Sequence, residues 1–79
     1  MNRIISLNVH LIPDNIKKNV LVNPIYPIGV LRMNIAKTFD IPVRSFEIRD
    51  KTNRIIDTDL DETSFNDYGI QKNMAAFRI

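Results

Sequence analysis

The stretch SFNDYGIQK at residues 64–72, followed by AFRI at residues 76–79, decides which fold this sequence predicts. Ser64 stands three residues before Asp67, a spacing that resembles a capping box and predicts the start of a short helix. Gly69 comes next and can adopt the positive φ that often ends a helix. A short helix followed directly by a strand is therefore expected near the C-terminus.

The segment 76–79 predicts the closing strand of a sheet. Side chains alternate between the two faces of a strand. The most apolar pair, Phe77 and Ile79, is expected to face the core, which leaves Ala76 and Arg78 on the outer face.

Two alternating segments at the other end predict a β-hairpin. Residues 3–12 place Ile5, Leu7, Val9 and Leu11 on one face, the period of a half-buried strand. The PDN sequence at 13–15 has turn chemistry, since proline fixes φ and the Asp and Asn side chains bond to nearby backbone. Residues 16–22 return as the second strand.

A helix is predicted from Ile28 onward. Pro24 and Pro27 prevent the second strand from continuing, and Pro27 suits the first turn of a helix. Apolar residues then recur every three or four positions, the stripe of an amphipathic helix: Ile28, Leu31, Ile35 and Phe39. The helix is expected to end at residues 40–42, because the residue before a proline avoids the α region.

Two short strands are predicted between the helices. Residues 45–50 place Phe46 and Ile48 inward, with Glu47 and Arg49 outward. Residues 54–56 form a brief fourth strand. The order is then strand, strand, helix, strand, strand, short helix, strand, with a polar loop at 57–63.

This element order and the sequence at 64–72 resemble ubiquitin. The resemblance covers nearly the whole chain and implies an α+β fold, the ubiquitin-like β-grasp, in which a mixed sheet of about five strands curves around one helix. Residues 1–79 would form a single domain. The Gly-Gly tail by which ubiquitin is attached to targets is missing, so the resemblance implies a domain that is not used as a covalent modifier.

A narrower resemblance points to bacteria. The sequence Tyr-Pro-Ile at residues 26–28 and Asp-Tyr-Gly-Ile at residues 67–70 are similar to motifs of the YukD/EsaB family, small accessory proteins of type VII secretion. That resemblance implies a cytoplasmic adaptor. Its partner would be a protein of the secretion machinery, such as the ATPase.

Composition excludes several classes of function. The 79 residues hold no cysteine, so disulfides and thiolate chemistry are absent. No apolar run approaches the ~20 residues of a membrane-spanning helix, and no signal peptide is expected. A net charge of +2 without a basic cluster interleaved with aromatics gives no support for nucleic-acid binding.

The sequence offers no catalytic constellation, and no cofactor is expected. His10 is the only histidine and stands in a predicted strand with no acid to orient it, so an enzyme is not predicted. The acidic run at 57–62 lacks the glycine and the final glutamate of an EF-hand calcium loop and is interpreted as a solvated loop. By the resemblance, Tyr68 is structural, with its hydroxyl bonded to backbone.

The outer face of the sheet is the main candidate surface. We expect Arg49, Arg78, Glu47 and His10 on it, and two arginines suit an acidic partner. By the resemblance, Arg49 replaces the central isoleucine of ubiquitin's receptor patch, so ordinary ubiquitin receptors should not bind. The alternative interpretation is a merely solvated polar face.

Ile25 and Tyr26 form a second candidate. Both are apolar residues in a proline-flanked loop, where they could act as a docking knob or simply cover the end of the core. The sequence favours neither interpretation over the other.

Two other hypotheses compete with the secretion adaptor. One is a ubiquitin-like interaction domain of a larger eukaryotic protein. The other is a Ras-binding-like signalling module, which would pair an edge strand with its partner and use the basic residues Lys17, Lys18, Arg32 and Lys37.

Overall fold

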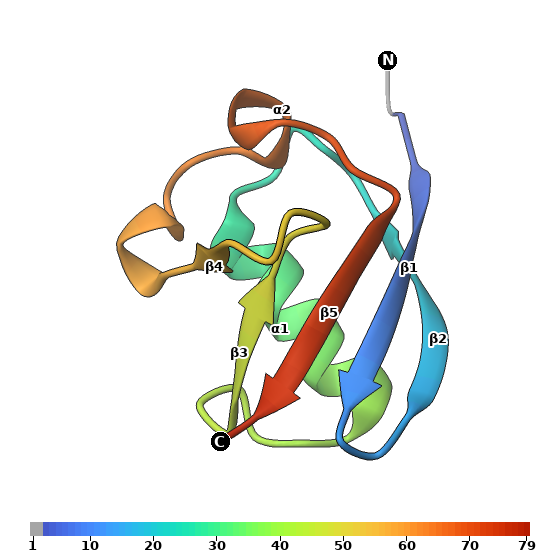
Figure 1. Cartoon of the computed structure of the whole chain (residues 1–79). Coiled ribbons are helices and arrows are strands. Elements are labelled where there is room, and N and C mark those ends of the chain that lie inside the picture. Colours follow the sequence, from blue (N-terminus) through green and yellow to red (C-terminus); the bar gives the residue numbers. More distant parts are fainter. Residues whose placement is uncertain (1–2) are drawn as a thin grey trace.

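A computed structural model describes residues 3–79 and shows one mixed sheet wrapped around one main helix (Figure 1). The strands are β1 (Ile5–Ile12), β2 (Ile16–Val22), β3 (Phe46–Arg49), β4 (Ile55–Ile56) and β5 (Asn73–Arg78). The helices are α1 (Ile28–Phe39), the single 3-10 turn η1 (Thr58–Leu60) and the short α2 (Phe65–Tyr68). The predicted element order is confirmed, and η1 adds a turn within the predicted loop.

The sheet order is β2-β1-β5-β3-β4, which places the first and last strands side by side at its centre. β1 pairs antiparallel with β2 and parallel with β5, and β5 pairs antiparallel with β3. In Figure 1 α1 crosses behind these strands, so the viewer looks onto the sheet face that points away from the helix. We call this the outer face.

The core lies between α1 and the inner face of the sheet. Fifteen buried apolar side chains form one cluster, and all strands and both α-helices contribute to it. The predicted stripe of α1 is confirmed, since Ile28, Leu31 and Ile35 are buried and Phe39 packs against the cluster. At about 25 cal/mol per Å² of apolar area, this cluster is the main stabilising term of the domain.

Backbone contacts rather than a side-chain cap fix the start of α1. The amide of Ile28 donates to the carbonyl of Thr63 at 2.8 Å, and that of Gly29 donates to the carbonyl of Asp61 at 2.9 Å. A Cβ at Gly29 would lie 3.2 Å from that carbonyl oxygen, so the close approach favours glycine here. At the other end Asp40 adopts the left-handed conformation and ends the helix, as its position before Ile41-Pro42 predicts.

The facing of β5 corrects the sequence-based prediction. Met74 and Ala76 point into the core, at 4% and 0% exposure, while Phe77 lies half-buried on the outer face and Ile79 is 89% exposed. The pairing register decides this, because Ala76 lies opposite Ile48 of β3 and therefore shares its inward face. The alternation of inward and outward residues in β5 is therefore shifted by one residue from the prediction.

Arg32 also departs from the expectation of a free basic residue. It is buried at 6% exposure and joins three elements. Its Nε and Nη2 donate to Asp61 Oδ1 at 3.0 and 2.8 Å, and Nη2 also donates to the carbonyl of Ile56 at 3.0 Å. The side chain therefore ties α1 to the end of β4 and to the loop after η1.

A second polar contact ties α2 to the turn after β3. The Tyr68 hydroxyl donates to Asp50 Oδ2 at 2.8 Å, so its partner is a carboxylate and not the backbone that the resemblance implied. Asp50 Oδ1 accepts from the amides of Thr52 and Arg54 and from the Thr52 hydroxyl. Tyr68 is structural, as predicted, but through a side chain.

The short helix α2 forms as its sequence predicts. Ser64 Oγ accepts from the amide of Asp67 at 3.0 Å, which confirms the cap, and Gly69 follows with φ 124°. Within residues 3–79 no helix is long and apolar enough to cross a membrane.

Candidate protein-interaction surface

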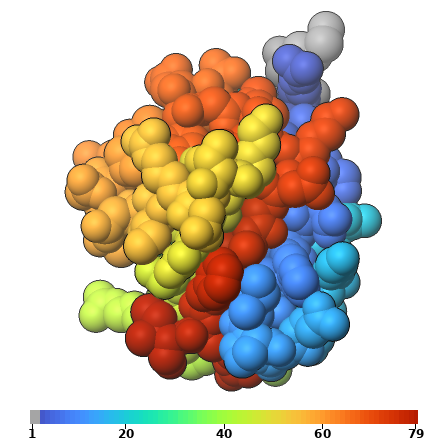
Figure 2. All heavy atoms as spheres, viewed as in Figure 1, coloured from blue at the N-terminus to red at the C-terminus, as the bar shows by residue number. Residues whose placement is uncertain are grey.

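The outer face gathers the side chains of four strands in register. Arg49 of β3 lies opposite Ala75 of β5, and Ala75 lies opposite His10 of β1. Lys17 of β2 is the cross-strand partner of His10. This row confirms that Arg49, its neighbour Glu47 and His10 share the face predicted for them. In Figure 2, which shows this face, β5 is the red diagonal between the blue β1–β2 hairpin and the yellow region around β3 and β4.

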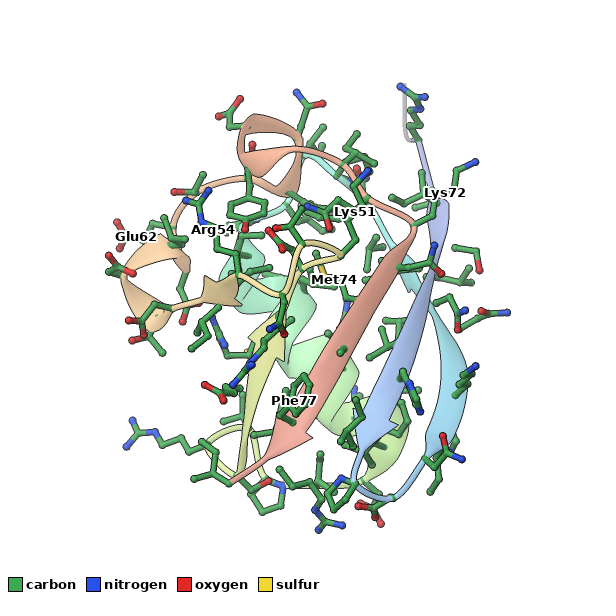
Figure 3. All side chains as sticks on the ribbon, in the orientation of Figure 1. Lys51, Arg54, Glu62, Lys72, Met74 and Phe77 are labelled. Carbon is green, nitrogen blue, oxygen red and sulfur yellow. The ribbon has the colours of Figure 1, made fainter. Side chains whose placement is uncertain are left out.

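Arg49 is held by contacts on three sides. Its Nη2 donates to Glu47 Oε1 at 3.0 Å and its Nη1 to Asn53 Oδ1 at 3.2 Å. The guanidinium stacks over the Phe77 ring, 4.5 Å from the ring centroid, a cation–π geometry. Figure 3 shows Phe77 on β5 within this face. Arg49 is therefore a positioned platform, with only 27% of its side chain exposed.

The small side chain of Ala75 leaves a hollow in the middle of the outer face. Its volume is about 410 Å³. We call it the outer-face hollow and define it by its lining residues: Asn8, His10, Lys17, Asp50, Lys51, Asn53, Asn73, Met74, Ala75 and Phe77. The sequence reasoning missed it, because the predicted phase of β5 placed Ala76 rather than Ala75 on this face.

The charges of the outer-face hollow are mostly positive. Lys17 and Lys51 are exposed and form no ion pair within residues 3–79. Asp50 is the only carboxylate among the lining residues, and it is buried. Burial raises the pKa of Asp50, but the hydrogen bonds from Thr52, Tyr68 and the backbone outweigh it and hold that pKa well below its usual range.

His10 has a polar neighbour and no acidic one in the described region. Its Nε2 lies 2.6 Å from Asn15 Oδ1 in the hairpin turn. Asn15 can fix the orientation of the ring, but no hydroxyl of the described residues bonds to His10 as a nucleophile would. The arrangement suits a hydrogen-bonding wall of the hollow.

Arg78 does not join the outer face. It follows the corrected phase of β5 and donates from Nη1 to Asp14 Oδ2 in the β1–β2 turn at 2.8 Å. The predicted pair of arginines is therefore wrong, since only Arg49 lies on the outer face. Arg32 is likewise removed from the basic set of the Ras-binding hypothesis, whereas Lys17, Lys18 and Lys37 are exposed.

Ile25 and Tyr26 project from the loop between β2 and α1, at 62% and 53% exposure. Tyr26 also borders a small cavity beside the core residues Leu31 and Phe65. The loop is anchored through its backbone, because the Tyr26 carbonyl accepts from the amide of Phe65 at 3.1 Å. A docking role for this pair stays a prediction.

Metal ligands are not gathered within residues 3–79: no group of three or more His, Cys, Asp or Glu side chains could hold an ion there. In the acidic run, Asp61 pairs with Arg32 and Asp57 Oδ1 accepts from the amide of Thr58 at 2.8 Å. These carboxylates fix loops.

Comparison with known proteins gives the fold. No protein-family model matches the sequence, and no curated protein matches it significantly. Among solved structures, the UBL domain of Plasmodium falciparum Dsk2 matches with a TM-score of 0.80 and 23% identity, covering 98% of this chain and 100% of that one. The chain has the ubiquitin-like fold.

Two further ubiquitin-like domains match this one. The C-terminal domain of the human 2'-5'-oligoadenylate synthetase-like protein has a TM-score of 0.77 and 19% identity, over 95% of this chain and 83% of that chain. The C-terminal domain of mouse tubulin-specific chaperone e has a TM-score of 0.69 and 9% identity, over 99% and 89%. At these identities the likeness shows the fold alone, so what this ubiquitin-like domain binds must be argued from its surface.

Proposed function

We propose that this ubiquitin-like domain is a non-enzymatic protein-interaction module that binds an acidic segment of a partner protein in the outer-face hollow. The charge of the hollow is the observation that carries this proposal. Lys17 and Lys51 border it, and their ammonium groups form no ion pair with any residue from 3 to 79. The Asp50 carboxylate is buried and accepts hydrogen bonds from its own turn and from Tyr68, and it forms no ion pair with either lysine within residues 3–79.

Phe77 supplies an apolar wall of the outer-face hollow, and the Arg49 guanidinium stacks over its ring beside the site. A guanidinium stacked on an aromatic ring presents a flat surface, and the pairing with Glu47 keeps it in one orientation. A partner segment that carries acidic side chains next to an aliphatic one would match both the lysines and the platform. Rim charges of this kind raise the association rate and set specificity more than affinity.

The test is a charge reversal on the hollow with a matched control. The Lys17→Glu/Lys51→Glu variant should lose binding to an acidic peptide pool, measured by fluorescence anisotropy at low salt. The control variant, Lys18→Glu/Lys37→Glu, carries the same change in charge on residues that lie outside the outer-face hollow. Equal binding by both variants would show that only net charge matters and would overturn the site.

Amide chemical shifts give an independent check of the same proposal. Titration of the labelled wild-type domain with the bound peptide should move the amides of Ala75, Phe77 and Lys51. Because screening weakens exposed charge pairs, the affinity should also fall as salt rises. Shifts confined to the opposite face of the molecule would contradict the proposal.

The biological setting is a finer proposal. We propose the type VII secretion adaptor on the strength of the motifs at 26–28 and 67–70, and the eukaryotic interaction domain as its competitor on the strength of the Plasmodium, human and mouse structures. Affinity purification of the wild type and the Lys17→Glu/Lys51→Glu variant from the native host decides between them. Recovery of the secretion ATPase by wild type alone supports the first, and recovery of ubiquitin-pathway proteins supports the second.

A further inference from the structure

A second surface lies at the β3–β4 edge of the sheet, between α1 and β3. It is a groove of about 880 Å³. Much of its wall is exposed and apolar, from Val30 and Met33 of α1, Val43 before β3, Ile55 of β4 and Ile79 after β5. In Figure 2 the left outline is notched here, between the orange atoms around η1 and the light-green atoms that precede β3.

The free edge of β3 runs along this groove. β4 pairs with β3 only at Ile48 and Arg49, because the chain turns away into η1 two residues after Ile56. Phe46 therefore has no strand partner on the β4 side, although Arg78 of β5 pairs with it on the other side. An unpaired strand edge presents backbone donors and acceptors that another extended chain can use.

The apolar residues of α1 face this edge as a pair. Val30 and Met33 are three positions apart, so they lie on the same side of the helix. Met33 is 64% exposed, and its flexible side chain can adapt to different apolar partners. The edge of β3 and this side of α1 form the two walls of the groove, which suits a single extended segment.

The charges at the two ends of the groove favour one orientation of a bound segment. Arg44 lies at the end that precedes β3, is exposed and forms no ion pair within the described part of the chain. At the other end are Asp57 and Asp61, the latter already paired with Arg32. An acidic residue of a bound segment would be favoured beside Arg44 and disfavoured beside Asp57.

We propose that this groove binds a short extended segment of a partner protein, which adds as a strand alongside Phe46 and carries an apolar side chain onto Met33 and an acidic one to Arg44. The mode is β-augmentation, in which backbone hydrogen bonds give affinity and alternate side chains give specificity. The site is separate from the outer-face hollow, so the domain would hold two protein segments at once.

A second copy of the chain fits the groove less well. Ile48 is already paired with Ile56, so each copy offers only the short edge before it. Two such edges, paired antiparallel, would bring the β4 strand of each copy against the chain that leads into β3 of the other. The observations therefore favour an extended segment of another protein, which has no neighbouring strand to collide with the chain before β3.

The first test uses a synthetic peptide with two alternating isoleucines followed by two aspartates. Its binding should slow hydrogen exchange at the Phe46 amide, a signal that outer-face binding would not produce. Replacing the peptide residue opposite Phe46 by proline should abolish that protection, because proline has no N–H to donate. Absence of binding, or exchange protection on β2 instead, would overturn the proposal.

Variants of the domain locate the contact. Met33→Glu should weaken binding roughly tenfold or more, since it places a charge against the apolar side chain. Arg44→Glu should weaken it less, and Lys37→Glu, on an exposed position of the same helix, should leave it unchanged. Met33 is exposed, so its variant should fold, as a thermal melt would verify.

Two controls separate this site from its competitors. The Lys17→Glu/Lys51→Glu variant should show the same peptide-dependent protection of the Phe46 amide as wild type, so failure of the outer-face proposal and failure of this one are distinguishable. In light scattering, the apparent molecular mass of the free domain should not increase with protein concentration. Protection of Phe46 that appears without peptide as concentration rises would instead assign the groove to a second copy and overturn the proposal.

Discussion

Charged side chains lie in two contrasting settings in this domain. Arg32 of α1 and Asp50 after β3 are buried and hydrogen-bonded, one with Asp61 and one with Tyr68. On the outer face, Lys17 and Lys51 are exposed and unengaged within residues 3–79. The first group of charges therefore holds the fold, and the second is available to a partner. The sequence alone does not distinguish these two groups of charged residues.

The largest expected effect comes from the buried arginine. Arg32→Leu should lower the free energy of unfolding by about 3 kcal/mol, because it removes one partner of a largely buried ion pair and leaves the Ile56 carbonyl without its donor. Urea denaturation measures this. Lys37→Leu on the same helix should change it by less than about 0.5 kcal/mol. Similar values for the two variants would break the comparison.

The buried carboxylate should give a smaller loss with a distinctive pH dependence. Asp50→Asn should cost about 2 kcal/mol at pH 7, since the hydrogen bonds to its charged oxygens weaken. The pKa of Asp50 is lowered in the folded state, so its stabilisation is present above pH ~4 and is lost as the pH falls below that value. Wild type and variant should therefore converge in stability in acid.

The control for this titration is Asp59→Asn, which changes an exposed carboxylate of η1. Its stability should follow wild type at every pH. If Asp50→Asn kept its full deficit at pH 2, the carboxylate charge would not be the cause of the loss.

The smallest effect is expected at Arg78. Its ion pair with Asp14 is partly exposed, at 42% and 28% for the two side chains, so Arg78→Ala should cost less than about 1 kcal/mol. Arg78→Glu should also leave acidic-peptide binding unchanged, in contrast to the lysine variant of the outer face. Loss of peptide binding by this variant would return Arg78 to the interaction surface.

The elements with a clear period were predictable, and those that depend on register were not. β1, β2 and α1 follow from alternation or a helical stripe that only one face can satisfy. In β5 the residues at 74–77 are all apolar, so the sequence allows either face to be buried. Pairing with β3 decides for Ala76, and this one-residue shift moved Arg78 off the candidate surface.

Long-range partners explain what else was missed. Arg32 and Asp61 are 29 positions apart, and Tyr68 and Asp50 are 18 apart, so no local pattern joins them. The nearest signal was an arginine one turn after Ile28 on the buried side of the helix. The groove beside β3 depends on where β4 ends, which local sequence does not specify.

The central place of β5 also bears on how the domain is made. Among the five strands of this sheet β5 is the last to be synthesised, yet it lies between β1 and β3 and pairs with both. During translation the hairpin and helix emerge first and have no strand to close the sheet between them. The nascent chain must keep its apolar faces from associating with other chains until β5 has left the ribosome. Truncation within β5 should therefore prevent folding rather than trim an edge.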